Sequence, residues 1–367
     1  MKKLLGAVLG ALLVSGTAGA DTIASDRAAA LVVYPGLIVL ESVGADALIQ
    51  ISNTSNEPVA VKCFYVNALG QCSTSGHDCF TTNQCTSEFD TCLPRWAETD
   101  FRVFLTARQP LAWQASVGLP RDKVPLNGTF TRGPGGQSNA GTHVPPFGNS
   151  EPTLGGQAAI GELKCYAINA DGTPSDRNVL KGEVTLVRTV PGIDVAKSNA
   201  IGIQAIPGAN NGDNQLVLGG DGAEYNGCPN ALILNHFFDG AQDPIVSVPV
   251  NTFLTLIPCT ENFLTQVPTR IPAQYLVFNE FEQRFSTSKA VECFFTALLS
   301  NIDTANSSRS VFNVGVAGTL TGQTRIRGVG GGLLGVATEF HGTRGATFNL
   351  HLQGEREGAS DVVTVVH

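Results

Sequence analysis

Three side chains near the C-terminus have residue types that could work together in acid–base catalysis or in metal binding. Glu339 and His341 are two residues apart, so on a β-strand they point to the same face, and His351 is near enough to come from the adjacent strand. One carboxylate and two imidazoles can serve as a general acid–base set or as metal ligands. Polar residues on the solvent side of a sheet give the same pattern, so the sequence assigns no catalytic residue.

A serine motif offers weaker support for an enzyme. Ser138 lies in a Gly-x-Ser-x-Ala segment that resembles the elbow of a serine hydrolase only in its letters. The surrounding residues 128–156 are rich in Gly and Pro, and they offer neither the strand before the serine nor the helix after it that an elbow needs. We therefore predict a loop there.

Two segments rich in Asn, Asp and Gly are the features of the sequence that could bind a cofactor, and that cofactor would be calcium. Calcium prefers carboxylate and carbonyl oxygens, and the candidate ligands are Asn169, Asp171, Asp176, Asp213 and Asp221. Neither segment has the full pattern of an EF-hand loop, and ordinary hairpin turns use the same residue types. The prediction is therefore no cofactor, with calcium as the alternative.

The nine cysteines are interpreted first as disulfide partners, because the compartments outside the cytosol are oxidising. Cys63 and Cys165 each follow an aliphatic residue by two positions, so each shares a strand face with it, while the intervening lysine points to the other face. We expect a bridge between these two, and a second between Cys228 and Cys259. Cys293, on a segment of the same pattern, is then left as a buried free thiol.

Four cysteines crowd into residues 70–94, a segment with many polar and almost no aliphatic residues. Such a segment cannot bury a core of its own, so covalent cross-links must order it. The four are Cys72, Cys79, Cys85 and Cys92, and their three possible pairings remain open. The rival interpretation, a four-thiolate zinc site, lacks the C-x-x-C pair typical of such sites.

Many short strands must position these residues. Runs rich in β-branched and aromatic residues, such as 47–52 and 59–66, are separated by turns rich in Asn, Gly and Pro. Charged residues make up 15% of the chain, below the usual share of about 25%. This low charge content suits strands and turns better than long helices held by salt bridges. The pattern predicts an all-β fold of two tandem antiparallel β-sandwich domains, with residues 70–94 as a disulfide-rich loop insert in the first.

Chain breakers and an apparent repeat set the predicted domain boundaries. Residues 190–192 combine Pro and Gly after a long alternating run, which divides the chain into a first domain of residues 21–190 and a second of residues 191–367. Segments 48–66 and 275–295 share an order of apolar strand, polar turn and cysteine-bearing strand. This order suggests that the first domain is duplicated in the second.

The run Ile51-Ser52-Asn53-Thr54-Ser55, followed by the strand at 59–64, resembles adjoining strands of immunoglobulin-like modules in secreted bacterial surface proteins. The resemblance covers two short segments in each half, brings no active-site motif and points to no named family. It implies that the sandwiches are Ig-like and serve as an extracellular scaffold or binding module.

The N-terminal residues have the order of a secretory signal peptide. Two lysines precede an apolar run from residue 4 to 14 that is too short to span a bilayer, and Ala18-Gly19-Ala20 follows as a cleavage site. We expect removal of residues 1–20 and a secreted chain without a transmembrane segment, located outside the cell, on its surface or in the periplasm. A net charge of −8 without a Lys/Arg cluster disfavours anionic partners, nucleic acids in particular.

These features predict an exported, non-enzymatic structural or adhesion protein whose partner is a surface protein or a glycan. One alternative is a carbohydrate-binding module, because sandwiches often present aromatic platforms. The candidate platform residues are Tyr65, Trp96, Trp113 and Tyr166. The other alternative is an unrecognised secreted hydrolase that uses the Glu and His trio.

Overall fold

The computed structural model describes residues 23–79, 85, 90–93, 97–118, 158–190, 192–356 and 358–365. Over these residues the chain is nearly all β, which confirms the predicted fold class. The helices among them are α1 (Val314–Ala317) and the 3₁₀ turns Glu41–Val43, Leu299–Asn301 and Ser307–Arg309. None of these is long and apolar enough to cross a membrane. The expected signal peptide, Ser138 and Trp96 lie outside the described residues.

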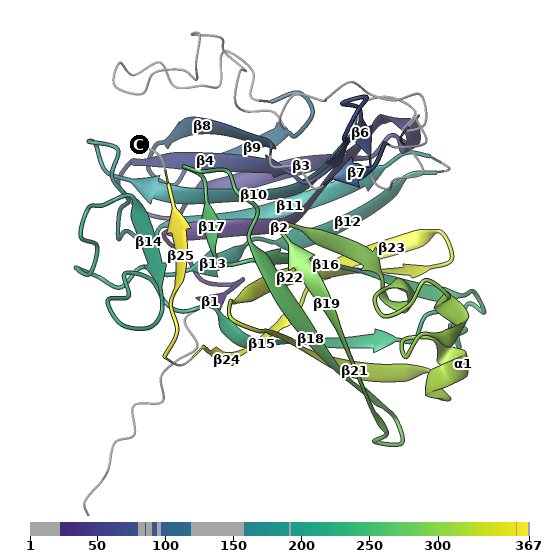
Figure 1. Cartoon of the computed structure of the whole chain (residues 1–367). Coiled ribbons are helices and arrows are strands. Elements are labelled where there is room, and N and C mark those ends of the chain that lie inside the picture. The colour runs from purple at the N-terminus through teal and green to yellow at the C-terminus, as the bar shows by residue number, and fades with distance from the viewer. Residues whose placement is uncertain are drawn as a thin grey trace, which may run out of the picture.

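The first sheet pair packs a six-stranded sheet against a four-stranded sheet (Figure 1). The six-stranded sheet has the order β1 (Ile23–Ala24), β13 (Ile201–Ile203), β2 (Leu31–Leu40), β10 (Ala158–Ile168), β4 (Val59–Asn67), β8 (Ala97–Leu105). Its partner has the order β12 (Asp194–Asn199), β11 (Leu180–Arg188), β3 (Asp46–Asn53), β9 (Pro110–Gln114). Val61, Ile49 and Trp113 belong to the apolar cluster that the two sheets enclose.

The second sheet pair packs a five-stranded sheet against another four-stranded sheet. The five-stranded sheet has the order β19 (Arg284–Glu292), β18 (Arg270–Asn279), β21 (Thr321–Gly328), β15 (Pro229–Phe237), β24 (His351–Glu355). The other has the order β20 (Phe295–Leu298), β16 (Val250–Pro258), β22 (Leu333–His341), β23 (Arg344–Asn349). Tyr275 from one sheet and Leu254 from the other lie in their common apolar cluster. Within both sheet pairs all ladders are antiparallel over the described strands.

A third, smaller sheet joins the two pairs, and we call it the bridging sheet. It has the order β14 (Gln215–Leu218), β25 (Asp361–Thr364), β17 (Glu261–Asn262) and appears at the left of Figure 1. Leu216 and Val363 of this sheet share an apolar cluster with Phe64 and Tyr166, which lie on the outer face of the six-stranded sheet. The cluster also takes in residues of the second sheet pair, so the two pairs share a core.

The six-stranded sheet is therefore buried on both faces. Every residue of β4 is buried, including Lys62, and β10 is buried at all positions except Ile160. Cys63 and Cys165 face the first sheet pair's own core, as predicted, whereas Lys164 on the opposite face is covered by the bridging sheet rather than by solvent. Alternation along a strand separates two faces but does not show which of them meets water.

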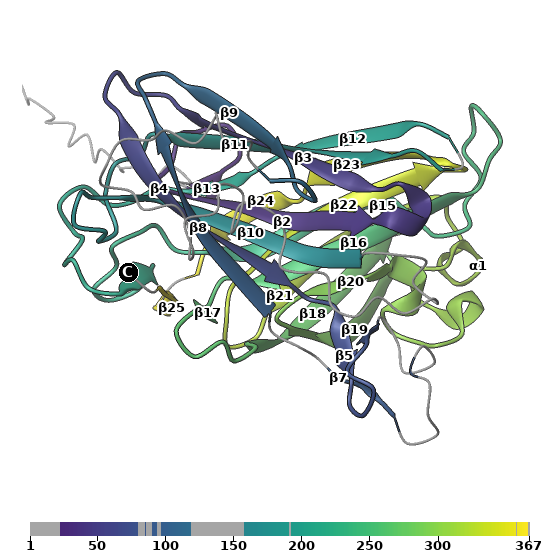
Figure 2. The same cartoon turned by 90° about the horizontal axis from the view of Figure 1, so that it is seen from above.

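Polar contacts at the sheet edges also hold the two pairs together. The Arg188 guanidinium donates to the Thr343 carbonyl at 2.6 Å and lies over the Phe340 ring, 5.5 Å from its centroid. The Asp194 carboxylate accepts from the Gly345 backbone N–H at 3.0 Å. Strands β12 and β23 consequently run side by side, as Figure 2 shows.

The strand pairing does not divide at residue 190. β11 and β12, on either side of that position, pair with each other over six positions from Glu183↔Asn199 to Arg188↔Asp194. β13 then pairs with β2. Residues 194–203 thus belong to the first sheet pair, and the boundary that we expected at residues 190–192 falls between two paired strands of one sheet.

The segments that suggested an internal repeat occupy different positions in the two sheet pairs. In the first, β3 and β4 lie in opposite sheets. In the second, the corresponding β18 and β19 are hydrogen-bonded neighbours in one sheet. The similarity of the two segments reflects strand and turn composition rather than equivalent places in the fold.

The cysteine-rich insert, residues 70–93, forms a small sheet of its own, which we call the Cys hairpin. It has the order β6 (Asp78–Cys79), β5 (Gly70–Cys72), β7 (Cys92–Leu93) and connects β4 to β8, which pair with each other. Two overlapping disulfides, Cys72–Cys85 and Cys79–Cys92, each span 13 residues. In Figure 2 the hairpin extends away from the sheets.

A fragment that ends at residue 190 should not fold on its own. It lacks β12 and β13, and it would expose the outer face of the six-stranded sheet, whose apolar residues would then meet water. We expect residues 21–190 to show no cooperative unfolding transition in urea, whereas residues 21–367 unfold cooperatively. A sharp transition for the fragment, followed by circular dichroism, would show instead that the first sheet pair is independent.

Candidate functional site

The predicted pair Glu339 and His341 does come together, and a third residue completes the cluster. His341 ends β22, and its Nε2 lies 3.0 Å from Glu339 Oε1 on the same strand face. On its other side, Nδ1 lies 2.5 Å from Asp243 Oδ2. Asp243 is fixed in a turn, where its Oδ1 accepts from the backbone N–H groups of Ile245 and Val246.

The charges of this cluster support one another. The hydrogen bond to Glu339, and to a smaller extent the one to Asp243, raises the pKa of His341 above its usual value. Backbone donors and His341 lower the pKa of Asp243. Both ring nitrogens thus donate to carboxylates in a stable imidazolium. Neither ring nitrogen is left free to accept a further proton in this arrangement, and the three side chains form one ion network.

His351 is not part of this cluster. It begins β24, where it pairs with Ile233 at the edge of the five-stranded sheet, whereas Glu339 lies in the four-stranded sheet. The neighbour of β22 is β23, which ends at Asn349. The turn after β23 carries the chain to the other sheet, so the expected trio of Glu339, His341 and His351 does not form.

The candidate calcium ligands lie in turns and loops, where three of the aspartates accept hydrogen bonds from the protein itself. Asp171 accepts from the N–H and hydroxyl of Thr173, and Asp176 accepts from the Gly208 N–H. Asp213 accepts from the Gln215 N–H. Asn169 likewise donates to Thr173 Oγ1 and to the Pro174 carbonyl, and Asp221 lies in a turn.

Within the described residues, two groups have enough close ligand atoms to suggest a metal, and both contain disulfides. They are Cys72, Cys79, Cys85 and Cys228, Cys259, Asp361. Their sulfur atoms are bonded to one another or to a fourth cysteine, which removes the thiolates that a metal would need.

Three of the four aromatic residues proposed as a sugar platform belong to the core, and Trp96 lies outside the described residues. Trp113 Nε1 donates to the Tyr65 hydroxyl at 2.6 Å, and both side chains are buried between the sheets. Tyr166 is buried on the outer face of the same sheet. Their large apolar area stabilises the interior, so these three are not exposed for stacking.

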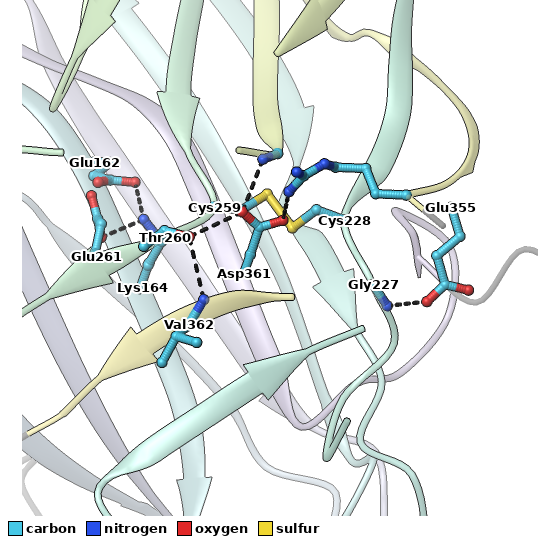
Figure 3. Close-up of a disulfide and its surroundings, with 12 residues drawn as sticks. Glu162, Lys164, Gly227, Cys228, Cys259, Thr260, Glu261, Glu355, Asp361 and Val362 are labelled. Carbon is cyan, nitrogen blue, oxygen red and sulfur yellow. Dashed lines mark hydrogen bonds and ion pairs between the residues drawn. A yellow bond between two sulfur atoms is a disulfide. The ribbon is translucent and has the colours of Figure 1, made fainter. Parts of the chain in front are cut away.

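A buried ion cluster lies where β10 meets the bridging sheet (Figure 3). Lys164 Nζ lies 2.7 Å from Glu162 Oε2 and 2.5 Å from Glu261 Oε2, and all three side chains are at most 2% exposed. Burial and the nearby Glu162 raise the pKa of Glu261 well above its usual range. Burial lowers the pKa of Lys164, but the two carboxylates outweigh it and raise the pKa overall. Lys164 therefore carries its charge inside the protein, between two carboxyl groups.

The Cys228–Cys259 disulfide, which the sequence predicted, lies next to this ion cluster, because Cys259 is two residues before Glu261. Thr260, between Cys259 and Glu261, donates to Asp361 Oδ1 at 3.0 Å, and Arg356 Nη1 lies 2.5 Å from Asp361 Oδ2 (Figure 3). A Cβ at Gly332 would lie 2.5 Å from Cys228 Cβ and 2.7 Å from Asp361 Oδ2, so only glycine fits there. Three consecutive residues of the chain thus anchor three different elements.

The remaining cysteines also follow the predicted framework. Cys63 and Cys165 lie directly opposite each other on β4 and β10 and form a disulfide within the six-stranded sheet. Cys293 is free and buried, and burial raises the pKa of its thiol. A thiol that does not ionise is a poor nucleophile and a poor metal ligand.

A groove of about 490 Å³ adjoins Glu339 at the exposed end of β15. Phe237, Phe278 and Phe348 give it apolar walls, while Asn235 and Gln323 give it amide groups. It collects aromatic and polar groups at the surface, unlike the buried platform residues. Sequence patterns do not reveal this groove, because its walls come from five strands of two sheets.

Removing the buried cation should destabilise the fold. In Lys164→Met, Glu162 and Glu261 stay buried without a cation, which costs about 3–5 kcal/mol of unfolding free energy. The triple variant Lys164→Met, Glu162→Leu, Glu261→Leu should recover most of that loss, because an apolar set of similar volume needs no charge desolvation. Denaturant titration measures both, with the exposed Lys197→Met as control. Equal stability of Lys164→Met and the wild type would contradict the buried ion cluster.

The His341 network should stabilise the protein at low pH. Because its folded pKa is raised, the stabilisation is complete below the usual histidine pKa of about 6.5 and is lost as the pH rises through the folded value. The wild type should therefore exceed His341→Gln in stability by more at about pH 5.5 than at about pH 9. Urea titrations at both values measure this, and His351→Gln on the edge strand is the control. If the difference in unfolding free energy between the wild type and His341→Gln is the same at both pH values, the ionised cluster is refuted.

The sequence matches no known protein-family model, and it has no significant match among curated proteins.

Proposed function

We propose that this chain is an exported, non-enzymatic protein that acts outside the cytoplasm as a structural or adhesion module. Its four disulfides are typical of an oxidising compartment, which is the extracellular space, the cell surface or the periplasm. The pattern of residues 1–20, outside the described residues, supports export as well.

The proposal includes an Ig-like character for the two sheet pairs. Two face-to-face antiparallel layers around each apolar cluster support it. The Cys63–Cys165 bridge differs from the Ig pattern, because it joins neighbouring strands of one sheet rather than two sheets. The shared core implies that the pairs act as one rigid body and not as beads on a flexible linker.

The Cys hairpin is the single observation that carries the proposal. None of its described residues belongs to either sheet pair's apolar cluster, yet it is braced by two disulfides and by Asp90. Burial opposes ionisation of Asp90, but hydrogen bonds from the N–H groups and hydroxyls of residues 73–75 outweigh it and lower its pKa. A rigid projection that the fold does not need is suited to contact with a partner.

Replacing residues 70–93 with a short Gly-Ser linker should leave the sheets folded and abolish binding to the cell surface or to a surface partner. β4 and β8 still pair, so the thermal unfolding midpoint should fall only slightly. Pull-down from surface extracts and cell fractionation measure binding, with Asp90→Ala as a milder variant. Undiminished surface binding by the linker variant would overturn the role of the hairpin.

A carbohydrate-binding role is the second candidate, and the groove near Glu339 favours it. Sugars bind through stacking on aromatic rings together with hydrogen bonds to amides and carboxylates, and the groove has both kinds of group. The hydrolase alternative loses its support, since His341 is held by two carboxylates and His351 lies in another sheet.

A further inference from the structure

The outer face of the five-stranded sheet carries arginines without counter-ions. Along β21, Thr324 and Ile326 point into the core and are buried, whereas Arg325 and Arg327 point outward. Two positions along a strand span about 6.6–6.8 Å, so the two guanidinium groups start from backbone positions that far apart. The net charge of −8 conceals this local positive face.

The neighbouring strands surround the arginines with neutral groups. Arg325 lies opposite Leu276 on β18, and Leu276 lies opposite Ser286 on β19. In the next row Arg327 lies opposite Gln274, and Gln274 lies opposite Ser288. These rows line a hollow of about 720 Å³ on the face of the sheet.

Two other arginines of the chain, Arg188 and Arg356, show what a paired guanidinium looks like in this fold. Arg188 pairs with Asp194 and Arg356 with Asp361, whereas among the described residues no carboxylate lies in ion-pair contact with Arg325 or Arg327. Two like charges side by side repel each other, and cross-strand pairing with acids would relieve the repulsion. The sequence places neutral residues there instead, which leaves both guanidinium groups available to an external anion.

We propose that this face binds an acidic polysaccharide, a polyuronate chain whose carboxylates pair with Arg325 and Arg327. A guanidinium binds a carboxylate through two parallel hydrogen bonds, and Gln274, Ser286 and Ser288 are placed to bind sugar hydroxyls. The inference rests on the proposed surface-binding function, because it names the ligand of that role.

The composition of the face favours a glycan over other anionic polymers. A protein partner would call for the aromatic residues that typify interface centres, but the hollow holds one aromatic residue, Tyr275, whose ring is buried in the core. Nucleic acid binders neutralise many phosphates with a long basic surface, whereas this hollow has two arginines. Neutral hydroxyl and amide groups with sparse positive charge match a polymer that has hydroxyls and sparse carboxylates.

Binding of polygalacturonate to the full exported protein tests the proposal. Isothermal titration should show binding that weakens as salt rises from about 0.05 M to about 0.5 M, because screening shortens the range of charge pairing. Fully methyl-esterified polygalacturonate, which keeps the sugar and lacks the charge, should not bind. Equal affinity for the two polymers, or preference for a DNA oligonucleotide, would overturn the proposal.

Variants locate the site. Arg325→Gln with Arg327→Gln should weaken binding at least about tenfold, and the matching Lys pair should bind at an intermediate level, because lysine keeps the charge and loses the two-pronged geometry. The exposed Arg309→Gln, which removes one charge from a 3₁₀ turn outside the hollow, should bind like the wild type. Wild-type affinity in the double Gln variant would overturn the assignment.

Cell fractionation of the same double variant separates the two levels of the proposal. If the wild-type protein binds no polyuronate, while the double variant is still exported and retained at the surface, the polyuronate ligand is refuted and the surface function stands. A wild-type protein found in the cytoplasm refutes the surface function itself.

Discussion

The burial of Lys164 is the constraint on which the arrangement of the sheets depends. A lysine on the outer face of a sheet ordinarily reaches water, but here that face is covered, so its charge must be met inside the protein. Glu261, 97 residues away, meets it from the bridging sheet. The segment that supplies Glu261 also supplies Cys259 to a disulfide and Thr260 to Asp361, so one short stretch holds the C-terminal strand, the second sheet pair and the six-stranded sheet together.

This anchoring explains why the molecule has a shared core rather than two separate ones. Phe64 and Tyr166 on one side, and Leu216 and Val363 on the other, bury apolar area that neither sheet pair could bury alone. Because the interior is held this way, the two surfaces that we propose for binding lie at the outside of the molecule. The Cys hairpin and the arginine-bearing face lie at the outside of different sheets, and each is held by ladders or disulfides rather than by its own core.

The ionisable clusters show how the fold limits chemistry. His341 has both ring nitrogens occupied by carboxylates, burial raises the pKa of Glu261, and the thiol of Cys293 lies in an apolar cluster. In each case the neighbouring groups of the fold, rather than solvent, set the pKa of the side chain. These groups contribute to stability, and the proposed recognition rests on the exposed faces.

The sequence alone determined the all-β class and the meeting of Glu339 with His341, because two-residue periodicity places such residues on a common strand face. It also predicted the Cys63–Cys165 pair, because both cysteines share a strand face with an apolar residue, and the Cys228–Cys259 pair, because these two flank one strand-rich stretch. Tertiary structure decided that Asp243 rather than His351 joins His341, that residues 194–203 remain with the first sheet pair, and that Lys164 is buried. Periodicity identifies the residues that share a face. It carries no information about the segment that covers the face, since that segment comes from a distant part of the chain and is selected by packing and by charge.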